Sequence, residues 1–380
     1  MKKLIIFLAL LLAINVFIPK GFAIANFQTS AKAMELIEKT TGRVIYSKNS
    51  DEKLAMASTT KIVTALTVLE NCDNLDEIVD VDDRAIGVPG TSIYLIKGEK
   101  LTVRELLYGM MLVSGNDAAT ALAYHISDSI EAFCALMLET AKRAGATNSS
   151  FSNPHGLDEE GHYTTAHDLA LITAKALSNQ TFAEIVSTRE YKISKNEKAP
   201  VRYLKNKNKL LNSFEGATGV KTGFTDDAGR CFVGSAERDG TEFVCVIFNC
   251  GPMFEECATL LEEAFKEYKL IEIVPPYNYI RRVGVIDGKE ESLKVYSRKG
   301  FSYPLTEEEQ NRLIYEYDIP ENIEAPIEKD SIVGKLNIYL GDKLLFSEEV
   351  YAMEEVKSVN FFDNIKEIIR NWNTNFLDIA

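Results

Sequence analysis

Apolar runs on either side of tight-turn dipeptides predict hairpins in two places of the chain. Residues 33–47 place two short apolar runs around Thr41-Gly42. Residues 229–236 and 241–249 are rich in β-branched and aromatic side chains and flank Asp239-Gly240. Both dipeptides favour tight turns between paired strands, so each region is predicted to form a β-hairpin.

Helical spacing of apolar side chains fills much of the sequence between these hairpins. Residues 62–69 carry apolar side chains at helical intervals, and Thr102 with Glu105 forms a capping box before another such run. Asp117 opens an alanine-rich helix, and residues 255–268 form a closing amphipathic one. Helices and strands therefore alternate in one large domain, which indicates an α/β (α+β) fold.

A change of pattern at Pro275-Pro276 predicts a domain boundary. Neither proline can continue a helix or donate to a strand ladder. Short alternating runs follow, punctuated by the turn dipeptides Asp287-Gly288 and Gly341-Asp342. We therefore assign residues 26–275 to the large domain and residues 276–354 to a small β domain.

The first 25 residues read as an export signal. Lys2 and Lys3 precede an apolar run from Leu4 to Ile18, and Ala23-Ile24-Ala25 supplies a small-x-small cleavage pattern. The alternative is a retained anchor, but the run is shorter than the ~20 residues that a spanning helix needs. We expect residues 1–25 to be a cleaved signal peptide.

Residues 355–380 form an amphipathic segment after the β domain. Its apolar side chains recur at a helical period and include Trp372, which is the one tryptophan of the chain, and its polar side chains occupy the other side. Such a helix is predicted either to lie in a membrane interface or to pack on a protein surface, and periodicity alone does not separate these two.

Composition and charge exclude several classes of protein. The chain has 380 residues, of which 46% are apolar, and its net charge is −14. A surface for nucleic acid would need clustered cations, so we expect no nucleic-acid partner. The six cysteines form no Cys-x-x-Cys pair, and we expect mostly buried, reduced thiols, with Cys231 and Cys245 as the one pair worth testing for a disulfide.

Two Ser-x-x-Lys tetrads occur close together, and their contexts differ. Ser50 and Lys53 lie in a polar turn, whereas Ser58 stands at the mouth of the apolar helix that carries Lys61. Residues three apart share a helix face, so the Lys61 amine is expected to reach the Ser58 hydroxyl. A serine needs such a base to become nucleophilic, and lysine becomes a base when burial or a neighbouring cation lowers its pKa.

Two further motifs offer groups for the same site. Lys221-Thr222-Gly223 leads into the second hairpin and supplies a second cation, a hydroxyl and a glycine that lets a ligand approach the backbone. Ser114-Gly115-Asn116 interrupts two predicted helices, where a loop can place side chains in a cleft. Taken alone, Ser-x-Asn is far more typical of an ordinary helix linker, and the alternative for Lys-Thr-Gly is a turn between strands.

The order Ser-x-x-Lys, Ser-x-Asn, Lys-Thr-Gly resembles that of the penicillin-recognising serine enzymes. Residues 51–61, 153–157, 206–211 and 219–225 extend the likeness to the serine-type D-alanyl-D-alanine carboxypeptidases, the low-molecular-mass penicillin-binding proteins. The resemblance covers about residues 31–355. It implies a penicillin-binding or serine β-lactamase-like domain with an antiparallel sheet flanked by helices, then a small all-β domain and a C-terminal amphipathic helix.

The resemblance implies catalytic roles for three side chains. Ser58 would attack the carbonyl between the two terminal D-alanines with Lys61 as general base, and Ser114 would relay a proton to the leaving amine. The backbone N–H groups of Ser58 and Phe224 would form the oxyanion hole. Water would then hydrolyse the acyl-enzyme.

The remaining motif residues would bind the substrate. Asn116 would hold both Lys61 and the substrate backbone, and Lys221, Thr222 and Gly223 would receive the terminal carboxylate. The implied partners are peptidoglycan stem peptides ending in D-Ala-D-Ala, β-lactams as covalent inhibitors, and the membrane surface through the C-terminal helix. The family acts on the outer side of the bacterial cytoplasmic membrane, and no metal or other cofactor is expected.

Three alternatives compete with this interpretation. A β-lactamase needs a deacylation base, but the nearest match to its Glu-x-x-Leu-Asn pattern, residues 208–212, begins with asparagine. A zinc peptidase is disfavoured because the four histidines lack ligand spacing. A non-catalytic protein that binds β-lactams or the cell wall is disfavoured only because every motif side chain is present.

Overall fold

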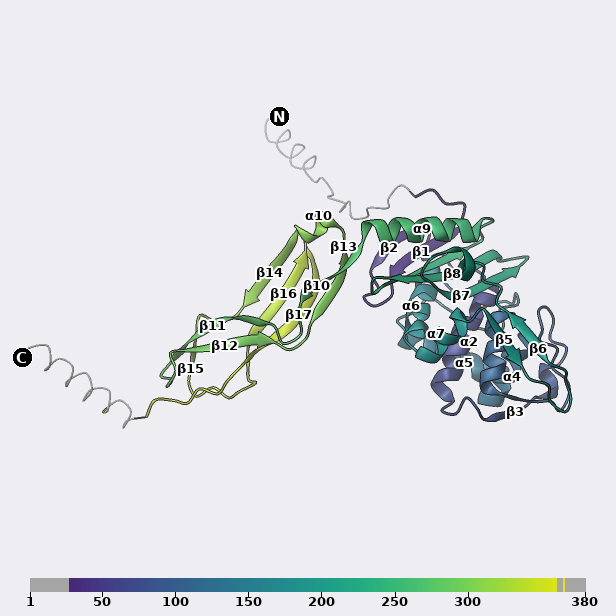
Figure 1. The fold of residues 1–380 in the computed structure, drawn as a ribbon, viewed down its shortest axis with the longest axis horizontal. Coiled ribbons are helices and arrows are strands. Elements are labelled where there is room, and N and C mark those ends of the chain that lie inside the picture. The colour runs from purple at the N-terminus through teal and green to yellow at the C-terminus, as the bar shows by residue number, and fades with distance from the viewer. Residues whose placement is uncertain (1–26, 361–364, 366–380) are drawn as a thin grey trace, which may run out of the picture. The chain divides into compact units, whose positions relative to one another are not determined.

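The computed structural model describes residues 27–360 and residue 365, and two compact units divide between Phe265 and Lys266 (Figure 1). The predicted signal peptide lies outside the described residues. So does the predicted C-terminal helix from residue 361 onward, apart from Ile365.

A five-stranded antiparallel sheet forms the centre of the first unit, in the order β2-β1-β9-β8-β7. Every residue of β9 is buried, so both faces of the sheet are covered. Figure 1 shows α9 on one face and the other large helices on the opposite face. The antiparallel sheet flanked by helices is thus confirmed. The strands are β1 (Ala33–Glu38), β2 (Val44–Lys48), β7 (Ala217–Thr225), β8 (Gly229–Arg238) and β9 (Thr241–Phe248).

The remaining elements of this unit surround the sheet. The helices are η1 (Ala57–Thr60), α2 (Lys61–Asn71), η2 (Asp83–Ala85), α3 (Val103–Leu112), α4 (Asn116–Ile126), α5 (Ile130–Arg143), α6 (Ala166–Leu177), α7 (Gln180–Ser187), α8 (Leu210–Ser213) and α9 (Met253–Glu267). Two small two-stranded antiparallel sheets pair β3 (Ile78–Asp80) with β4 (Lys100–Thr102) and β5 (Glu190–Ile193) with β6 (Arg202–Lys205).

Local sequence signals account for where these elements begin and turn. Asp239 and Gly240 both have positive φ, 50° and 75°, as a two-residue turn with the twist of the flanking strands requires. Thr102 and Glu105 form the predicted capping box of α3. These signals fix the turn between β8 and β9 and the start of α3.

The second unit is built almost wholly of strands. Its six-stranded sheet has the order β14-β16-β17-β12-β11-β15, and β10 pairs with β13 beside it. Apolar side chains such as Val295 and Ile338 are fully buried in its core. The elements are β10 (Lys269–Val274), β11 (Tyr279–Ile286), β12 (Ser292–Ser297), β13 (Phe301–Leu305), α10 (Glu307–Gln310), β14 (Leu313–Asp318), β15 (Asn322–Glu324), β16 (Ile332–Leu340) and β17 (Lys343–Ala352).

The second unit extends beyond the predicted β domain at both ends. Strand β10 precedes Pro275-Pro276 and pairs within this unit. At the other end, Val356 bridges Ile327 and is fully buried in the core. Prolines therefore mark a turn inside this unit rather than its first residue, because the chain pairs again on both sides of them.

All six cysteines are buried and free. Cys245 lies opposite Gly234 rather than Cys231, and its thiol interacts with that of Cys257, so the strand register does not place the suspected pair together.

Among the described helices, none alone has the length and apolar composition to cross a bilayer. Only α4 and α5 taken together, with a bend of 90° between them, have that length and composition.

Candidate active site

Ser58 and Lys61 meet at the junction of η1 and α2. Ser58 lies in the single turn of η1, and Lys61 is the first residue of α2, so the two side chains point the same way. The Lys61 Nζ atom lies 3.0 Å from Ser58 Oγ, and the lysine side chain is completely buried. The backbone at Ala57, directly before the serine, is left-handed with φ of 49°. Such backbone is costly and is found at functional sites.

Burial and neighbouring positive charges together lower the pKa of Lys61. Desolvation, then the charges of Lys221 and Lys207, lower the pKa of Lys61 well below its usual value, while Asp117 opposes the shift. Burial, assisted by Lys207, also lowers the pKa of Lys221 to about 7. Keeping Lys61, Lys207 and Lys221 all charged would cost free energy, because like charges in a poorly solvated site repel. Both burial and these charges therefore favour the neutral form of the Lys61 amine.

The Ser-x-Asn motif reaches the same point from the link between α3 and α4. Ser114 has a left-handed backbone with φ of 69°, and its side chain is 5% exposed. Asn116 Oδ1 accepts a hydrogen bond of 2.7 Å from Lys61 Nζ. Asn116 also donates from Nδ2 to the Pro89 carbonyl at 2.6 Å and from its backbone N–H to the Thr91 carbonyl at 2.7 Å. The loop that contains Pro89 and Thr91 therefore fixes the amide that holds Lys61.

The Lys-Thr-Gly motif lies on β7, an edge strand that passes directly beside η1. A Cβ atom at Gly223 would lie 2.9 Å from the Ser58 backbone nitrogen, so only glycine allows this approach. A cavity of about 410 Å³ opens between the motifs. It is lined by Ser58, Thr91, Ser114, Lys207, Thr222, Gly223, Phe224, Arg230, Met253 and Phe254.

The predicted residues therefore converge. Ser58, Ser114, Thr222, Gly223 and Phe224 line the cavity itself. The three remaining predictions, Lys61, Asn116 and Lys221, are buried beside it, with Lys61 joined by hydrogen bonds to Ser58 and Asn116. Ser50 and Lys53 do not line the cavity.

A loop at residues 153–156 also contributes to the site, although none of its residues was predicted to do so. The His155 carbonyl accepts a hydrogen bond of 2.6 Å from Lys61 Nζ. Asn153 Oδ1 holds this loop by accepting from the Gly156 N–H at 2.7 Å. A side chain at Gly156 would collide with the Ala57 carbonyl at 1.9 Å. The functional atom is a carbonyl oxygen, which residue type cannot reveal.

The histidine of this loop, His155, and a second histidine, His162, are both held neutral. Desolvation, followed by repulsion from Lys61, lowers the pKa of His155 to about 3, and desolvation lowers that of His162 to about 4. His162 Nδ1 accepts from the Ser152 N–H at 3.0 Å, so its Nε2–H faces Thr60 Oγ1 at 2.9 Å. Thr60 in turn donates to the Ala57 carbonyl at 2.8 Å. These bonds brace the turn that presents Ser58 without adding charge.

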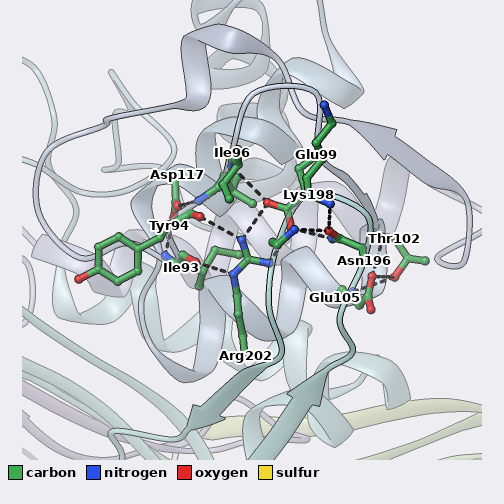
Figure 2. Close-up of polar contacts among 12 residues, drawn as sticks. Ile93, Tyr94, Ile96, Glu99, Thr102, Glu105, Asp117, Asn196, Lys198 and Arg202 are labelled. Carbon is green, nitrogen blue, oxygen red and sulfur yellow. Dashed lines mark hydrogen bonds and ion pairs between the residues drawn. The ribbon is translucent and has the colours of Figure 1, made fainter.

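Asp117 supports the loop around Thr91 from the side of the active site. Its buried carboxylate accepts hydrogen bonds from the backbone N–H groups of Ile93 and Leu95, each at 3.0 Å, and from Ser92 Oγ at 2.6 Å. Figure 2 shows Asp117 facing Ile93 in this way. The residue after Asn116 therefore anchors the loop that holds Asn116.

Arg202 and Glu99 form a second set of contacts that hold the loop around Thr91 (Figure 2). Arg202 donates to the carbonyls of Ile93 and Tyr94 at 2.7 and 2.9 Å. It also forms two bonds of 2.6 and 2.8 Å to Glu99, which is completely buried. Burial would raise the pKa of Glu99, but hydrogen bonds from Arg202 and Asn196 hold it below its usual value. The β5–β6 hairpin thus fixes the loop through one bidentate ion pair.

Comparison with known families agrees with this geometry. Residues 20–251 match the model of the D-alanyl-D-alanine carboxypeptidase family, and residues 268–358 match that of the penicillin-binding protein 5 C-terminal domain. The two matches fall on the two units of the fold.

Individual relatives match nearly the whole chain. The D-alanyl-D-alanine carboxypeptidase DacF of Bacillus subtilis is 33% identical, with 98% of this chain and 99% of the relative covered. The carboxypeptidase DacC of Escherichia coli is 30% identical, covering 93% and 92%. The structure of penicillin binding protein 5 from Haemophilus influenzae superposes with a TM-score of 0.73 at 25% identity, covering 87% and 98%. The chain therefore belongs to the D-alanyl-D-alanine carboxypeptidase family and is a serine peptidase of the penicillin-binding protein class.

Proposed function

We propose that this enzyme removes the terminal D-alanine from peptidoglycan stem pentapeptides through an acyl-enzyme on Ser58. The observation that carries the proposal is the buried Lys61 amine, 3.0 Å from the Ser58 hydroxyl in a cavity that Ser114 and Thr222 also line. A serine in that position has both a base and room for a substrate.

Lys61 acts first, as the general base. A neutral amine has two N–H groups, and two acceptors, Asn116 Oδ1 and the His155 carbonyl, lie within hydrogen-bond distance of it. Its lone pair then faces Ser58 Oγ. As the oxygen attacks the penultimate D-alanine carbonyl carbon, the hydroxyl proton moves to the amine.

The carbonyl oxygen of the substrate becomes an oxyanion at this step. We place it between the backbone N–H groups of Ser58, on η1, and Phe224, on β7, because these two elements approach each other closely at Gly223. The bond to the terminal D-alanine nitrogen then breaks, and that nitrogen takes a proton that Ser114 relays from Lys61. Water attacks the resulting ester, which releases the shortened peptide and restores the Ser58 hydroxyl.

Lys221, Thr222 and Gly223 receive the terminal carboxylate in this proposal. The pKa of Lys221 is about 7 in the free enzyme, so an incoming anion would favour its ammonium form. Asn116 uses its Oδ1 for Lys61 and one N–H for the Pro89 carbonyl. Its second N–H is left to donate to the substrate backbone.

Release of D-alanine from a peptide ending in D-Ala-D-Ala tests the activity. We expect the purified protein to release D-alanine, the Ser58→Ala variant to release none above background, and the Ser50→Ala variant to match the wild type. Equal release by the wild type and Ser58→Ala would contradict the proposal and would favour a non-catalytic wall-binding protein.

Labelled penicillin separates a carboxypeptidase from a β-lactamase. Asn208 stands where the β-lactamase pattern needs glutamate, and its Oδ1 accepts from the Leu210 backbone N–H at 3.0 Å. We therefore expect a persistent adduct, which mass spectrometry would locate on Ser58. Rapid turnover of the penicillin with no stable adduct would favour the β-lactamase.

The family acts on peptidoglycan, outside the cytoplasm, and we propose that this chain is exported by residues 1–25 and held at the outer membrane surface by residues 355–380. The apolar side of that segment, which includes Trp372, is the basis for the proposal. Truncation after Asn360 spares Val356, which belongs to the core of the second unit. We expect this truncation to move the protein from the membrane to the soluble fraction while small-peptide hydrolysis is kept, and an unchanged distribution would contradict the proposal.

A further inference from the structure

One wall of the cavity has no role in the steps above. It is formed where β7 ends and where β8 and α9 begin, by Phe224, Arg230, Met253 and Phe254. Phe224 pairs with Arg230 across the two strands, so both side chains lie on one face of the sheet. Phe224 is 63% exposed, and the Phe254 ring packs against Phe232 with centroids 4.8 Å apart. The wall thus combines apolar rings with one guanidinium.

The charge of this wall contrasts with that of the chain as a whole. The chain carries more acidic than basic side chains, 56 against 42, yet none of the described residues that line the cavity is acidic. Arg230 is exposed, and among the residues that the structure describes it has no ion-pair partner, although Asp226 and Asp227 occupy the neighbouring hairpin turn. An unpaired cation at the mouth of a pocket selects anionic groups.

The direction of the substrate follows from the proposed function, and this inference rests on it. The scissile carbonyl lies at the Phe224 N–H, and the terminal carboxylate lies toward Lys221 and Thr222. An extended peptide beside an edge strand therefore runs past Phe224 toward the end of β7. The residue on the amino side of D-Ala-D-Ala then reaches the wall that holds Arg230.

We infer that this wall is a subsite for a stem residue whose side chain is a methylene chain ending in a carboxylate. The methylene groups pack on Phe224, Met253 and Phe254, and the carboxylate pairs with Arg230. Guanidinium groups bind carboxylates through two parallel hydrogen bonds, which gives the subsite direction as well as charge. A stem residue ending in an ammonium group meets repulsion in the same place.

Three matched substrates test the inference. Each is an acetylated tripeptide X-D-Ala-D-Ala, with X as L-2-aminopimelate, L-norleucine or L-lysine, so the stems are similar and only the terminal group differs. We expect kcat/KM to fall in that order, with about a tenfold difference between the acidic and the basic substrate, because a partly exposed pair contributes modestly. The difference should shrink as salt is added.

Substitution at Arg230 must remove this order. Arg230→Gln is expected to bring the three kcat/KM values within about twofold of one another, and Arg230→Glu to reverse the order. Lys195→Gln makes the same charge change at an exposed lysine that does not line the cavity, and it should keep the wild-type order.

Two results would overturn the inference. One is a wild-type enzyme that does not distinguish the three substrates. The other is an Arg230→Gln variant that loses activity on all three by the same factor, because that pattern would assign Arg230 to the terminal carboxylate they share.

A separate readout distinguishes failure of this subsite from failure of the proposed function. If no tripeptide is cleaved above the Ser58→Ala background, the proposed function fails. Penicillin acylation of Ser58 then replaces cleavage, with two penicillins whose acyl side chains end in a carboxylate or in a methyl group. We expect faster acylation by the carboxylate form in the wild type and equal rates in Arg230→Gln. Equal rates in both proteins would overturn the subsite.

Discussion

The chain contains two Ser-x-x-Lys tetrads eight residues apart, and only one lies in the active site. Ser50 accepts a hydrogen bond of 2.8 Å from Ser47, and exposed Lys53 lies 4.9 Å from the centre of the Tyr163 ring. Ser58 and Lys61 are instead 3.0 Å apart, with the lysine completely buried. The four-residue pattern is the same, but only the second lysine is buried and within hydrogen-bond distance of its serine, as a general base must be.

The contrast shows that the chemistry comes from the neighbours of the lysine. Lys61 has two fixed acceptors, Asn116 and the His155 carbonyl, and two cations that lower its pKa. An exposed lysine keeps its proton at neutral pH because water solvates the ammonium. Burial therefore turns one of two identical patterns into a nucleophile and its base.

Removing each serine gives the largest expected contrast. Ser58→Ala should lower D-alanine release by about 10⁴-fold or more, since only binding and the oxyanion hole remain. Ser50→Ala should leave it within about twofold. Initial rates of D-alanine release measure both, and comparable losses in the two variants would erase the distinction between the tetrads.

Removing each lysine gives the next largest contrast. Lys61→Gln keeps a hydrogen-bond donor but no base, and we expect acylation by penicillin to slow by about 10²- to 10⁴-fold. Lys53→Gln should acylate at the wild-type rate. Labelling with penicillin, quenched at a series of times, gives both acylation rates. An unimpaired Lys61→Gln variant would show that another group takes the Ser58 proton.

The loop around Thr91, which holds Asn116, is itself held by Arg202 through its ion pair with Glu99. Arg202→Gln leaves the buried Glu99 carboxylate without its ion-pair partner, which should lower the free energy of unfolding by about 3 kcal/mol. It should also slow acylation about tenfold where the protein stays folded, because the Thr91 loop holds Asn116. Urea unfolding measures the first effect, and Arg84→Gln, at a surface pair with Asp82, is the control that should change little. Full stability in Arg202→Gln would contradict the buried-pair argument.

The smallest expected effect concerns the second cation near Lys61. Lys207→Gln removes a positive charge that lowers the pKa of both Lys61 and Lys221. The pKa of Lys61 then rises, less of the amine is neutral at a given pH, and the acid limb of the acylation rate moves to higher pH. Rate profiles from pH 5 to 9 measure this shift, with Lys205→Gln as a matched control. A limb that moves to lower pH would contradict the electrostatic assignment.

Much of this site could be predicted from the sequence because its parts are local. The spacing of Ser58 and Lys61 is a property of one helix turn, and the glycine of Lys221-Thr222-Gly223 marks a close backbone approach. The hairpin at Asp239-Gly240 follows from its turn dipeptide. Such signals need no knowledge of distant residues.

The rest depends on contacts between distant parts of the chain. The His155 carbonyl reaches Lys61 across 94 residues of sequence, and Arg202 reaches Glu99 across 103. Backbone oxygens have no sequence signature, and a buried ion pair is visible only once both partners are placed. Val356 shows the same limit for domain ends, because its burial depends on the bridge to Ile327.

The pH dependence of the acylation step in a single turnover tests the central claim most directly. The rate constant for penicillin acylation of Ser58, followed from pH 5 to 11, should rise along an acid limb with a midpoint far below the usual lysine pKa and then level off. Lys61→Gln should lack that limb. A wild-type rate that keeps climbing until it levels off near pH 10 would contradict the account, because Lys61 would then be an ordinary charged lysine at neutral pH.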